Sequence, residues 1–566
     1  MTAGRALLAA LALGFGLALV VAGPDLPGLT QGLPGRLNDD GLHAIYLHHQ
    51  VHDALAAGRL DLSDPHQLWP VGAPLLRING GNILEMLVSG LTRVLLPFPA
   101  WLSAAALLWV PLNLLAFVPL GRALWGRDDL ALAGGAAWAV SPVLLAQLGP
   151  LRLTQVALVG LPLAVLGLWR IAETGGRRSA LLAGGGMALL GYGYWFYAAM
   201  LTLCVPAFLA YGRRQGRPLG AQLRDLAAAG ALSAILAAPL LGQIVAVVLQ
   251  GEWMPPPPLS AEFASPVFDD ALRIGWRQPD GLRGWWPVIL IPGALWAVRT
   301  PGRGRLWAAC AGICVVFALG PAQDLLGARW LLPSYPLWRW APGFDRMHHP
   351  DRWMAIASLF LVLLSVDGLR RVRPRAAWAL PVGVLAQAWL AGPLPLGTWT
   401  PEAPAHWQAV AQQAPAAGPG AVIVLPLLRA PNTSAWQHLH GRPLLGGMVE
   451  NQPWFLPPDF RTFLGTSPLL HDLWDLTHGQ RVAPTLWQAD LDQLHAAGFS
   501  LLVLDRRAWT RHPPSGPLDP EPWLRRSLGE PLYTGSSGAI WALPAEGRPG
   551  PLPDRGPLAL EGPPDG

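Results

Sequence analysis

The chain alternates between long apolar segments and short polar loops. An α-helix needs about 20 consecutive apolar residues to cross a hydrocarbon core of about 30 Å, and about eleven segments approach that length. We therefore predict that each segment is a membrane-spanning helix, giving an α-helical multi-pass membrane domain over residues 1–393. The approximate bounds are 6–22, 101–121, 130–147, 154–171, 179–196, 198–212, 226–249, 285–298, 306–321, 353–369 and 376–393.

Arginines precede the first predicted span and follow every second span after it. Short cytoplasmic loops of membrane proteins carry an excess of basic residues, whereas translocated loops do not. We therefore predict a cytoplasmic N-terminus and place the segment after the last span outside. The arginines that set this orientation are Arg5, Arg122, Arg127, Arg170, Arg177, Arg178, Arg213, Arg214, Arg217, Arg224, Arg299, Arg303, Arg305, Arg370, Arg371, Arg373 and Arg375.

The composition agrees with a membrane protein. Of the 566 residues, 52% are hydrophobic and 13% are charged, whereas a soluble protein carries about 25% charged residues. An ordinary soluble enzyme is therefore excluded. The net charge of +5 comes from arginines, and their placement in alternate loops indicates membrane topology, so we predict no nucleic-acid partner. Cys204, Cys310 and Cys314 all lie in apolar segments, which leaves no pair for a disulfide outside the membrane.

The first predicted outside loop, residues 24–100, begins with a polar cluster. Asn38, Asp39 and Asp40 stand where a helix would be N-capped. The apolar residues that follow on one face at helical spacing are Ala44, Leu47, Val51, Ala54 and Leu55. The pattern predicts an amphipathic helix with two adjacent carboxylates at its N-terminus, where the helix dipole favours negative charge. Two interpretations of these acids remain open, namely helix capping alone and a catalytic role.

Two histidines four residues apart lie on the same predicted helix. At this spacing His48 and His52 can present their imidazoles to one metal ion. The sequence does not indicate where further ligands would come from. The alternative interpretation is a polar helix face in water.

The first loop then continues through Trp69, Pro70, Gly72 and Pro74 in the stretch LWPVGAPL. The cytoplasmic start of the first span, the acidic pair, the amphipathic helix and this turn together resemble the GT-C class of membrane glycosyltransferases over residues 1–393. Residues 335–371 are also similar to the segment that enters a late span in bacterial proteins of that class, and Arg352 is the matching position.

The resemblance implies a glycosyltransferase of the hexosyltransferase type. Such an enzyme transfers a sugar from a polyprenyl-phosphate-linked donor to an envelope acceptor on the outer face of the bacterial plasma membrane. In that class an aspartate at the start of the first loop acts as catalytic base or helps to hold a divalent cation, and Asp39 and Asp40 are the matching positions. The expected partners are membrane lipid and the lipid-linked donor, with the acceptor unknown.

Arg352 is the candidate for binding the phosphate of the donor, together with His348 and His349. A guanidinium group suits phosphate because its donors form a planar fork. The alternative interpretation of Arg352 is an interfacial anchor for the tenth predicted span.

The chain departs from the class in the second predicted outside loop, where many members carry another acidic motif. This loop, near GPLRLTQ, contains Arg152 and no carboxylate. Asp269 and Asp270, in the long loop after the seventh predicted span, are the candidates for the missing acid. An ordinary solvated loop is the alternative interpretation.

From about residue 394 the sequence predicts a small extracytoplasmic α/β domain, residues 394–545. Strands are expected over 421–425 and 500–504, a helix over 491–497, and a hairpin between 532–534 and 539–543. Residues 546–566 are dense in proline and glycine, which predicts a disordered tail.

A non-enzymatic role is the alternative to glycosyl transfer. The protein would then be a transporter or flippase of lipid-linked saccharides, or a scaffold for envelope assembly. Transporters usually carry ionisable residues near the bilayer midplane and repeated halves. The predicted spans contain few charges and no clear repeat, whereas the carboxylates gather in the outside loops, and this favours an enzyme.

Overall fold

The computed structural model describes residues 3–59, 63–74, 82–249, 288–298, 302–325, 328–341, 344, 350–412, 420–447, 456–477, 488–511 and 519–543. The chain divides into two compact units. The helical unit contains residues 1–37 and 80–400, and the mixed unit contains residues 38–79 and 401–565. The sequence analysis assigns residues 38–79 to the long outside loop of the membrane domain, whereas in the structure they group with residues 401–565.

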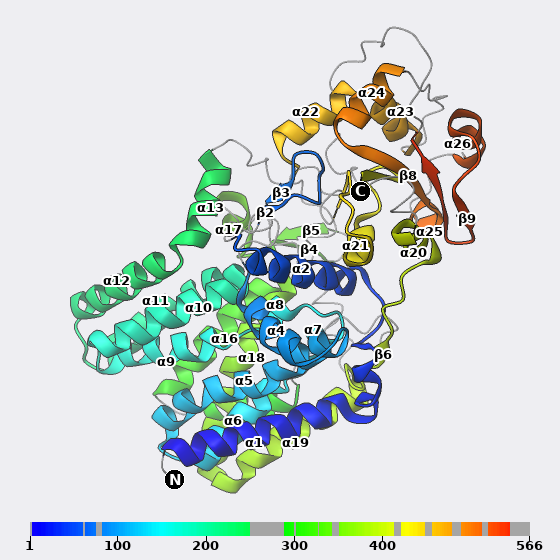
Figure 1. The fold of residues 1–566 in the computed structure, drawn as a ribbon. Helices are drawn as coiled ribbons and strands as arrows, with labels where there is room; N and C mark the ends of the chain where they lie inside the picture. The colour runs from blue at the N-terminus through cyan, green and yellow to red at the C-terminus, as the bar shows by residue number, and fades with distance from the viewer. Residues whose placement is uncertain are drawn as a thin grey trace. The chain divides into compact units, whose positions relative to one another are not determined.

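The helical unit consists mainly of α-helices (Figure 1). Its helices are α1 (Ala3–Ala22), α4 (Leu84–Leu95), α5 (Ala100–Trp125), α6 (Asp128–Ala139), α7 (Pro142–Leu148), α8 (Leu153–Val156), α9 (Gly160–Glu173), α10 (Arg177–Thr202), α11 (Val205–Arg214), α12 (Leu219–Leu236), α13 (Ala238–Leu249), α15 (Ile291–Val298), α16 (Arg303–Ala318), α17 (Tyr335–Trp340), α18 (Trp353–Val372) and α19 (Ala379–Ala391). Short 3₁₀ helices are η1 (Gly23–Asp25), η2 (Gly28–Thr30), η4 (Val288–Leu290), η6 (Pro350–Arg352) and η7 (Pro374–Trp378). Two antiparallel strand pairs complete the unit, β1 (Leu33–Pro34) with β6 (Thr398–Trp399) and β4 (Ala322–Leu325) with β5 (Ala328–Leu331).

Four helical segments of the described chain are long and apolar enough to cross a membrane, and each of two bent helix pairs adds one more if it forms a single span. The four are Gly4–Asp25, Ala100–Trp125, Leu153–Glu173 and Pro350–Arg371, and the bent pairs are α6 with α7 and α10 with α11. The protein is therefore a multi-pass membrane protein, but the predicted number of about eleven spans is not confirmed.

Fewer spans are found than predicted partly because proline interrupts some of the apolar runs. The run predicted over 226–249 divides into α12 and α13, and Pro239 stands at the start of α13. Proline lacks a backbone N–H and its ring clashes with the carbonyl of the preceding helical turn. An apolar run long enough for one span therefore forms two shorter helices.

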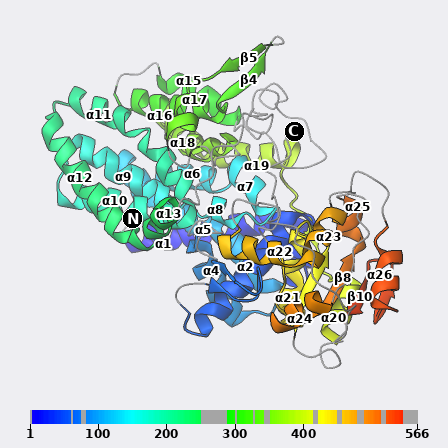
Figure 2. The ribbon, with the colours of Figure 1, turned by 90° about the horizontal axis from the view of Figure 1, so that it is seen from above.

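Close helix packing in this unit depends on glycine. Helix α10 packs against α9 and α12, and these helices lie side by side with α11 (Figures 1 and 2). A Cβ atom added at Gly167 on α9 would lie 2.2 Å from the backbone nitrogen of Ala183 on α10. Small residues of this kind allow helix backbones to approach each other in membranes.

A buried carboxylate joins the ends of three helices. Asp367 on α18 is 2% exposed and accepts hydrogen bonds from Trp125 Nε1 on α5 at 3.0 Å and from Arg303 Nε on α16 at 3.1 Å. Arg303 also donates to the carbonyl of Leu124, and Arg370 lies 3.0 Å from the same carboxylate. A charge buried in this way requires such partners because its desolvation is costly.

The mixed unit contains a four-stranded sheet with helices around it. Its elements are α2 (Asp39–Ala56), β2 (Ser63–Asp64), β3 (Ala73–Pro74), α20 (Ala405–Gln412), β7 (Ala421–Leu425), η8 (Pro431–Trp436), α21 (Gln437–His440), α22 (Pro458–Thr466), α23 (Pro468–Thr477), α24 (Gln488–Ala496), β8 (Phe499–Asp505), α25 (Arg506–Arg511), α26 (Glu521–Leu528), β9 (Tyr533–Gly535) and β10 (Gly538–Ala542). The strand order is β7-β8-β10-β9, and β7 is parallel to β8 while the other pairs are antiparallel. The strands and the hairpin predicted from the sequence are thus present.

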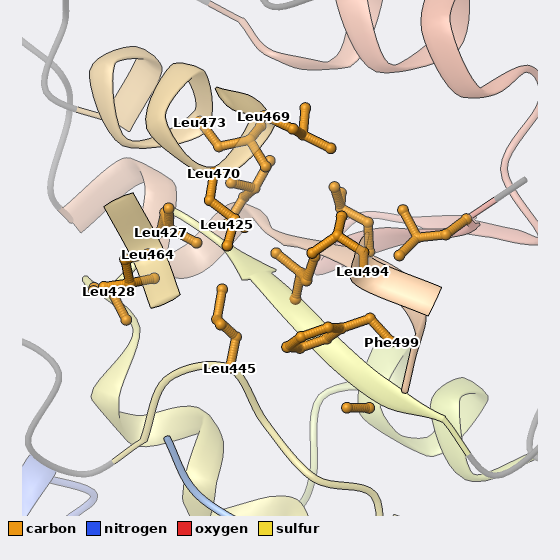
Figure 3. Packing of buried hydrophobic residues seen from close by; sticks show 14 of the residues in the cluster. Leu425, Leu427, Leu428, Leu445, Leu464, Leu469, Leu470, Leu473, Leu494 and Phe499 are labelled. Atoms are coloured by element: carbon orange, nitrogen blue, oxygen red, sulfur yellow. The ribbon is translucent and has the colours of Figure 1, made fainter. Parts of the chain in front are cut away.

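The core of the mixed unit is built from leucine side chains that pack on the sheet (Figure 3). Leu68 and Ala73 of the first loop belong to this core. The loop backbone is also bonded to the C-terminal segment, because Leu68 N donates to the carbonyl of Gly446 and Trp69 N to that of Leu444, each at 3.0 Å. Residues 38–79 of the first loop are therefore a structural part of the mixed unit.

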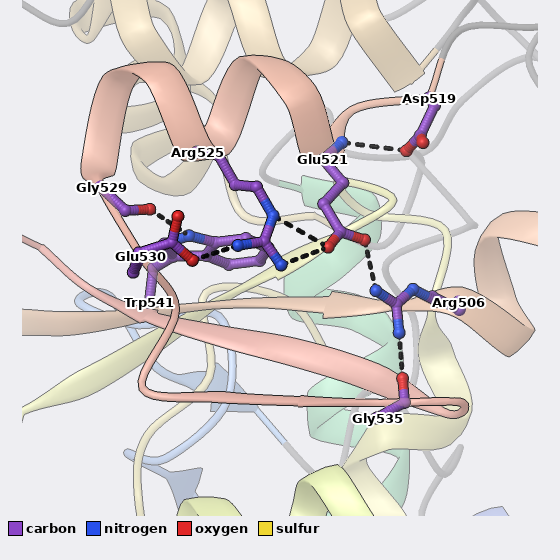
Figure 4. Close-up of polar contacts among 8 residues, drawn as sticks. All are labelled: Arg506, Asp519, Glu521, Arg525, Gly529, Glu530, Gly535 and Trp541. Carbon is purple, nitrogen blue, oxygen red and sulfur yellow. Dashed lines mark hydrogen bonds and ion pairs between the residues drawn. The ribbon is translucent and has the colours of Figure 1, made fainter.

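Polar contacts attach α26 to α25 and to strands β9 and β10 (Figure 4). Glu521 accepts a hydrogen bond from Arg525 Nη2 at 3.0 Å and pairs with Arg506, which also donates to the carbonyl of Gly535. The hydrogen bond from Arg506 is the main cause of a lowered pKa of Glu521. Trp541 Nε1 donates to the carbonyl of Gly529 at 3.1 Å and closes the end of α26.

Candidate functional site

The two aspartates predicted to be catalytic lie in the first turn of α2. Asn38 precedes them with extended backbone, and its Oδ1 accepts a hydrogen bond from Gly41 N at 2.8 Å. Asn38 is therefore the N-cap residue, and the capping role does not fall to Asp39 or Asp40. Asp39 is exposed and Asp40 is half-buried.

A side chain from the C-terminal part of the mixed unit meets Asp39. Asn432 Nδ2, on η8, donates to Asp39 Oδ1 at 2.6 Å across 393 residues of sequence. His43 lies one turn further along α2, where burial lowers its pKa while Asp40 and Asp39 oppose that shift. We refer to Asp39, Asp40, His43 and Asn432 as the acidic site. It combines two carboxylates, a carboxamide and an imidazole that is neutral at physiological pH.

The histidines predicted to bind metal pack against other rings. The rings of His48 and His52 are edge to face with centroids 6.2 Å apart. His48 is buried, and burial together with the neighbouring imidazoles of His52 and His49 lowers its pKa to about 3. His49 stacks on His438 with centroids 4.7 Å apart.

Within the described ranges, no three histidine, cysteine, aspartate or glutamate side chains form a group that could hold a metal ion. Metal binding by His48 and His52 therefore stays a prediction.

Arg352 lies in the helical unit at the end of η6, immediately before α18. Its Nη1 donates to the hydroxyl of Tyr194, and its Cζ lies 5.3 Å from the centroid of that ring. Tyr194 interrupts α10, with φ of −160° and ψ of 102°. A cation over an aromatic face is attracted by the ring quadrupole. The interrupted helix thus holds a tyrosine that orients the guanidinium group.

A second arginine acts on the same tyrosines. Arg152, at the N-cap position of α8, interacts electrostatically with Tyr194 and Tyr197, as do Arg352 and Asp351. We refer to Arg152, Tyr194, Tyr197 and Arg352 as the tyrosine–arginine cluster. Arg352 Nε is buried, and no hydrogen-bond acceptor for it is found among the described residues. The two guanidinium groups suit a phosphate group, and Asp351 adds a negative charge that acts on Arg352 and on both tyrosines.

Sequence reasoning identified Arg352 but not its partners. Arg152 stands in the loop where a carboxylate was expected, and Tyr194 and Tyr197 lie in an apolar run whose aromatic residues are typical of a helix core. The only local signal is the repeated glycine and tyrosine in GYGYWFY, residues 191–197, which is unusual for a straight helix. His348, His349, Asp269 and Asp270 lie outside the described residues.

A serine, a histidine and an aspartate also meet at the end of the sheet. Ser537 Oγ lies 3.0 Å from His406 Nδ1, and His406 Nε2 lies 3.5 Å from Asp505 Oδ2. His406 is 0% exposed and Ser537 is 6% exposed, so both side chains are buried. We interpret the contact as structural, because it joins α20 to β8 and to the turn between β9 and β10.

The comparisons with known proteins concern the fold. No protein-family model and no curated protein matches the sequence. The chain is similar to the cryo-EM structure of arabinofuranosyltransferase AftD from Mycobacteria, with a TM-score of 0.55 and 18% identity over 95% of this chain. A mutant of AftD gives a TM-score of 0.56 and 18% identity over 96% of this chain. The chain therefore shares its fold with AftD, a GT-C-type membrane glycosyltransferase. The resemblance inferred from the sequence is thereby confirmed for the fold.

The matched AftD structures are longer than this chain. The chain spans 40% of the AftD structure and 42% of the mutant structure. The oligosaccharyltransferase AglB from Archaeoglobus fulgidus, solved with an inhibitory peptide and a dolichol-phosphate, matches with a TM-score of 0.43 and 11% identity over 88% of this chain and 69% of AglB.

Proposed function

We propose that the protein transfers a sugar from a polyprenyl-phosphate-linked donor to an envelope acceptor on the outer face of the bacterial plasma membrane. The observation that carries this proposal is the GT-C fold over 95% of the chain. The first-loop carboxylates and the tyrosine–arginine cluster supply the chemistry that such a transfer needs.

The acidic site would activate the acceptor. A hydroxyl oxygen of the acceptor attacks the anomeric carbon of the sugar, the bond from that carbon to the phosphate oxygen breaks, and the hydroxyl proton passes to Asp39 or Asp40. Positioned general bases contribute about 10²–10⁴-fold to a rate. A divalent cation at this site would take Asp39 or Asp40 as one of its oxygen ligands and would neutralise charge on the departing phosphate. Within the described residues, no group of three histidine, cysteine, aspartate or glutamate side chains forms such a site.

The tyrosine–arginine cluster would bind the phosphate of the donor. Arg352 was expected in this role from the sequence, and we now add Arg152 because both arginines act on the same pair of tyrosines. His348 and His349 stay in the proposed phosphate site, and Asp269 or Asp270 stays the proposed second acid. Breakage of the sugar–phosphate bond leaves negative charge on the phosphate, and paired guanidinium groups stabilise such charge.

The orientation follows from the arginines in alternate loops. A cytoplasmic N-terminus places the first loop and the C-terminal residues on the outer side, where both would meet lipid-linked donors and envelope acceptors. The mixed unit is then extracytoplasmic.

The test compares envelope glycans and glycolipids by mass spectrometry in cells with the intact gene, a deletion, and Asp39→Asn or Asp40→Asn versions at equal expression. Asp53→Asn is the matched control, because Asp53 is an exposed aspartate on the same helix. We expect the deletion to remove a glycan, one of the two first-turn variants to reproduce the loss, and the control to behave as wild type. A full glycan profile in both first-turn variants would overturn the catalytic assignment.

One observation favours the alternative of a transporter or flippase for lipid-linked saccharides. Transporters bind charged groups at interrupted helices, and Tyr194 interrupts α10 beside Arg352. In that case Arg352→Leu would abolish the glycan while both first-turn aspartate variants retain it. A transferase requires both sites.

A further inference from the structure

We propose that Asn432 is a positioning residue that holds Asp39 as the catalytic base, so that the C-terminal segment completes the acidic site. The inference rests on the proposed function and deepens it. It also separates the two first-turn aspartates, because it assigns the proton transfer to Asp39 rather than to Asp40.

The contact has the geometry of a charge-assisted hydrogen bond. Asn432 Nδ2 lies 2.6 Å from Asp39 Oδ1. An ionised carboxylate can only accept, so the amide nitrogen of Asn432 must be the atom that faces it. A donor on one oxygen of a carboxylate fixes the direction in which that carboxylate points.

The segment that carries Asn432 is firmly anchored. Thr433 Oγ1 donates to the carbonyl of Ala430 at 2.8 Å, and Gln437 Nε2 donates to the carbonyls of His66 and Arg442 at 2.7 and 3.0 Å. Ala435 in the same segment is fully buried. The carboxamide is therefore presented from a rigid part of the fold, as a positioning group requires.

A second contact fixes the rotation of α2. His49 on α2 stacks on His438 of α21 with centroids 4.7 Å apart. Asn432 and His438 thus hold α2 at its first turn and near its middle. Consecutive helical residues point about 100° apart, so a helix held in this way directs Asp39 and Asp40 differently.

The hydrogen bond is not needed to start the helix. Asn38 already caps α2 through Gly41 N, and η8 keeps its own bonds without Asp39. Loss of the Asn432 donor should therefore change the direction of the Asp39 carboxylate while leaving both elements folded.

The experiment uses the full-length protein, induced in cells that lack the gene, and follows the rate at which the missing glycan reappears. The variants are Asn432→Leu, which removes the donor at similar volume, and Asn432→Asp, which replaces it with a carboxyl group. Gln408→Leu is the matched control, because Gln408 is an exposed carboxamide that donates to the carbonyl of Ala403 at 2.9 Å in the same unit. Protein levels in membranes are measured for each variant, and external pH is set to 7.5 or 5.5.

We expect Asn432→Leu to slow the glycan rate about tenfold, as the loss of one hydrogen bond to a charged group predicts. Asn432→Asp should be slower still at pH 7.5, because two carboxylates then face each other. It should recover at pH 5.5 relative to wild type, since one protonated carboxyl can again donate to Asp39. Asp40 and His43 also titrate near Asp39, but every variant and the wild type retain them.

Three results would overturn the inference. If Asn432→Leu and Gln408→Leu match wild type while Asp39→Asn abolishes the glycan, Asn432 does not position the base and the proposed function stands. If Asn432→Asp is equally impaired at both pH values, its role is structural only. If Asp39→Asn itself retains the glycan, the base assignment fails, and the inference fails with it.

Discussion

The burial of Leu68 in the mixed unit gives the sharpest prediction for stability. Leu68 belongs to the first loop, is 0% exposed and packs in the core around β7 and β8. Truncation of a buried leucine to alanine costs about 2–5 kcal/mol, because transfer energy is lost and a cavity remains. A unit of this size loses about 2–4 °C of melting temperature per kcal/mol. We therefore expect Leu68→Ala to lower the melting temperature of the mixed unit by about 4–20 °C.

The backbone at this position adds a second test. Leu68 has a φ of 50°, in the left-handed region that costs a residue with a Cβ about 1–2 kcal/mol. At an ordinary position glycine is less stable than alanine, but here it relieves that cost. We expect Leu68→Gly to be at least as stable as Leu68→Ala.

The assay is thermal unfolding of the purified full-length protein in detergent, followed by tryptophan fluorescence and by limited proteolysis of the mixed unit. Leu55→Ala is the matched control, because Leu55 comes from the same loop and is 40% exposed. The control should shift the melting temperature by less than about 2 °C. Equal melting temperatures for Leu68→Ala and Leu55→Ala would refute the conclusion that Leu68 is part of the mixed-unit core.

Three further predictions concern charged groups. Asp367→Asn should destabilise the helical unit by about 3 kcal/mol, measured by thermal unfolding, because Arg303 would lose its buried carboxylate partner. An unchanged melting temperature would contradict a stabilising role of the Asp367 ion pairs. Burial opposes ionisation of Asp505, but His406 and two backbone N–H groups outweigh it and lower the pKa of Asp505. The stability that ionised Asp505 contributes is therefore complete above about pH 4 and is lost as the pH falls through the lowered pKa of the folded state. We expect Asp505→Asn to make the free energy of unfolding less pH-dependent in that acidic range. An unchanged pH slope would contradict this role of Asp505. Arg352→Leu should reduce the envelope glycan as strongly as the gene deletion, whereas a wild-type profile would leave Arg352 as an interfacial anchor.

Local signals in the sequence were sufficient for several elements. The polar cluster at 38–40 predicts a capped helix, and α2 begins at Asp39 with Asn38 as its N-cap. The predicted hairpin is present as β9 and β10, with Ala539 opposite Thr534. Capping and hairpin pairing depend on residues a few positions apart, so a single sequence contains the information.

Contacts between distant segments could not be predicted in this way. The hydrogen bond from Asn432 to Asp39 joins residues 393 positions apart, and the electrostatic contact of Arg152 with Tyr194 depends on how α8 packs beside the break in α10. The predicted apolar face of α2 included Leu55, which is 40% exposed. Helical periodicity predicts which residues share a face of a helix, but tertiary packing decides which of those residues are buried.

The most direct test of glycosyl transfer follows the sugar itself. Purified protein in lipid vesicles is supplied with synthetic polyprenyl-phosphate sugars labelled in the sugar, together with an envelope extract from the deletion strain. We predict that wild type moves label into glycan and releases polyprenyl phosphate, and that Asp39→Asn does neither. Label that stays on the lipid while it crosses the bilayer would contradict a transferase and identify a flippase.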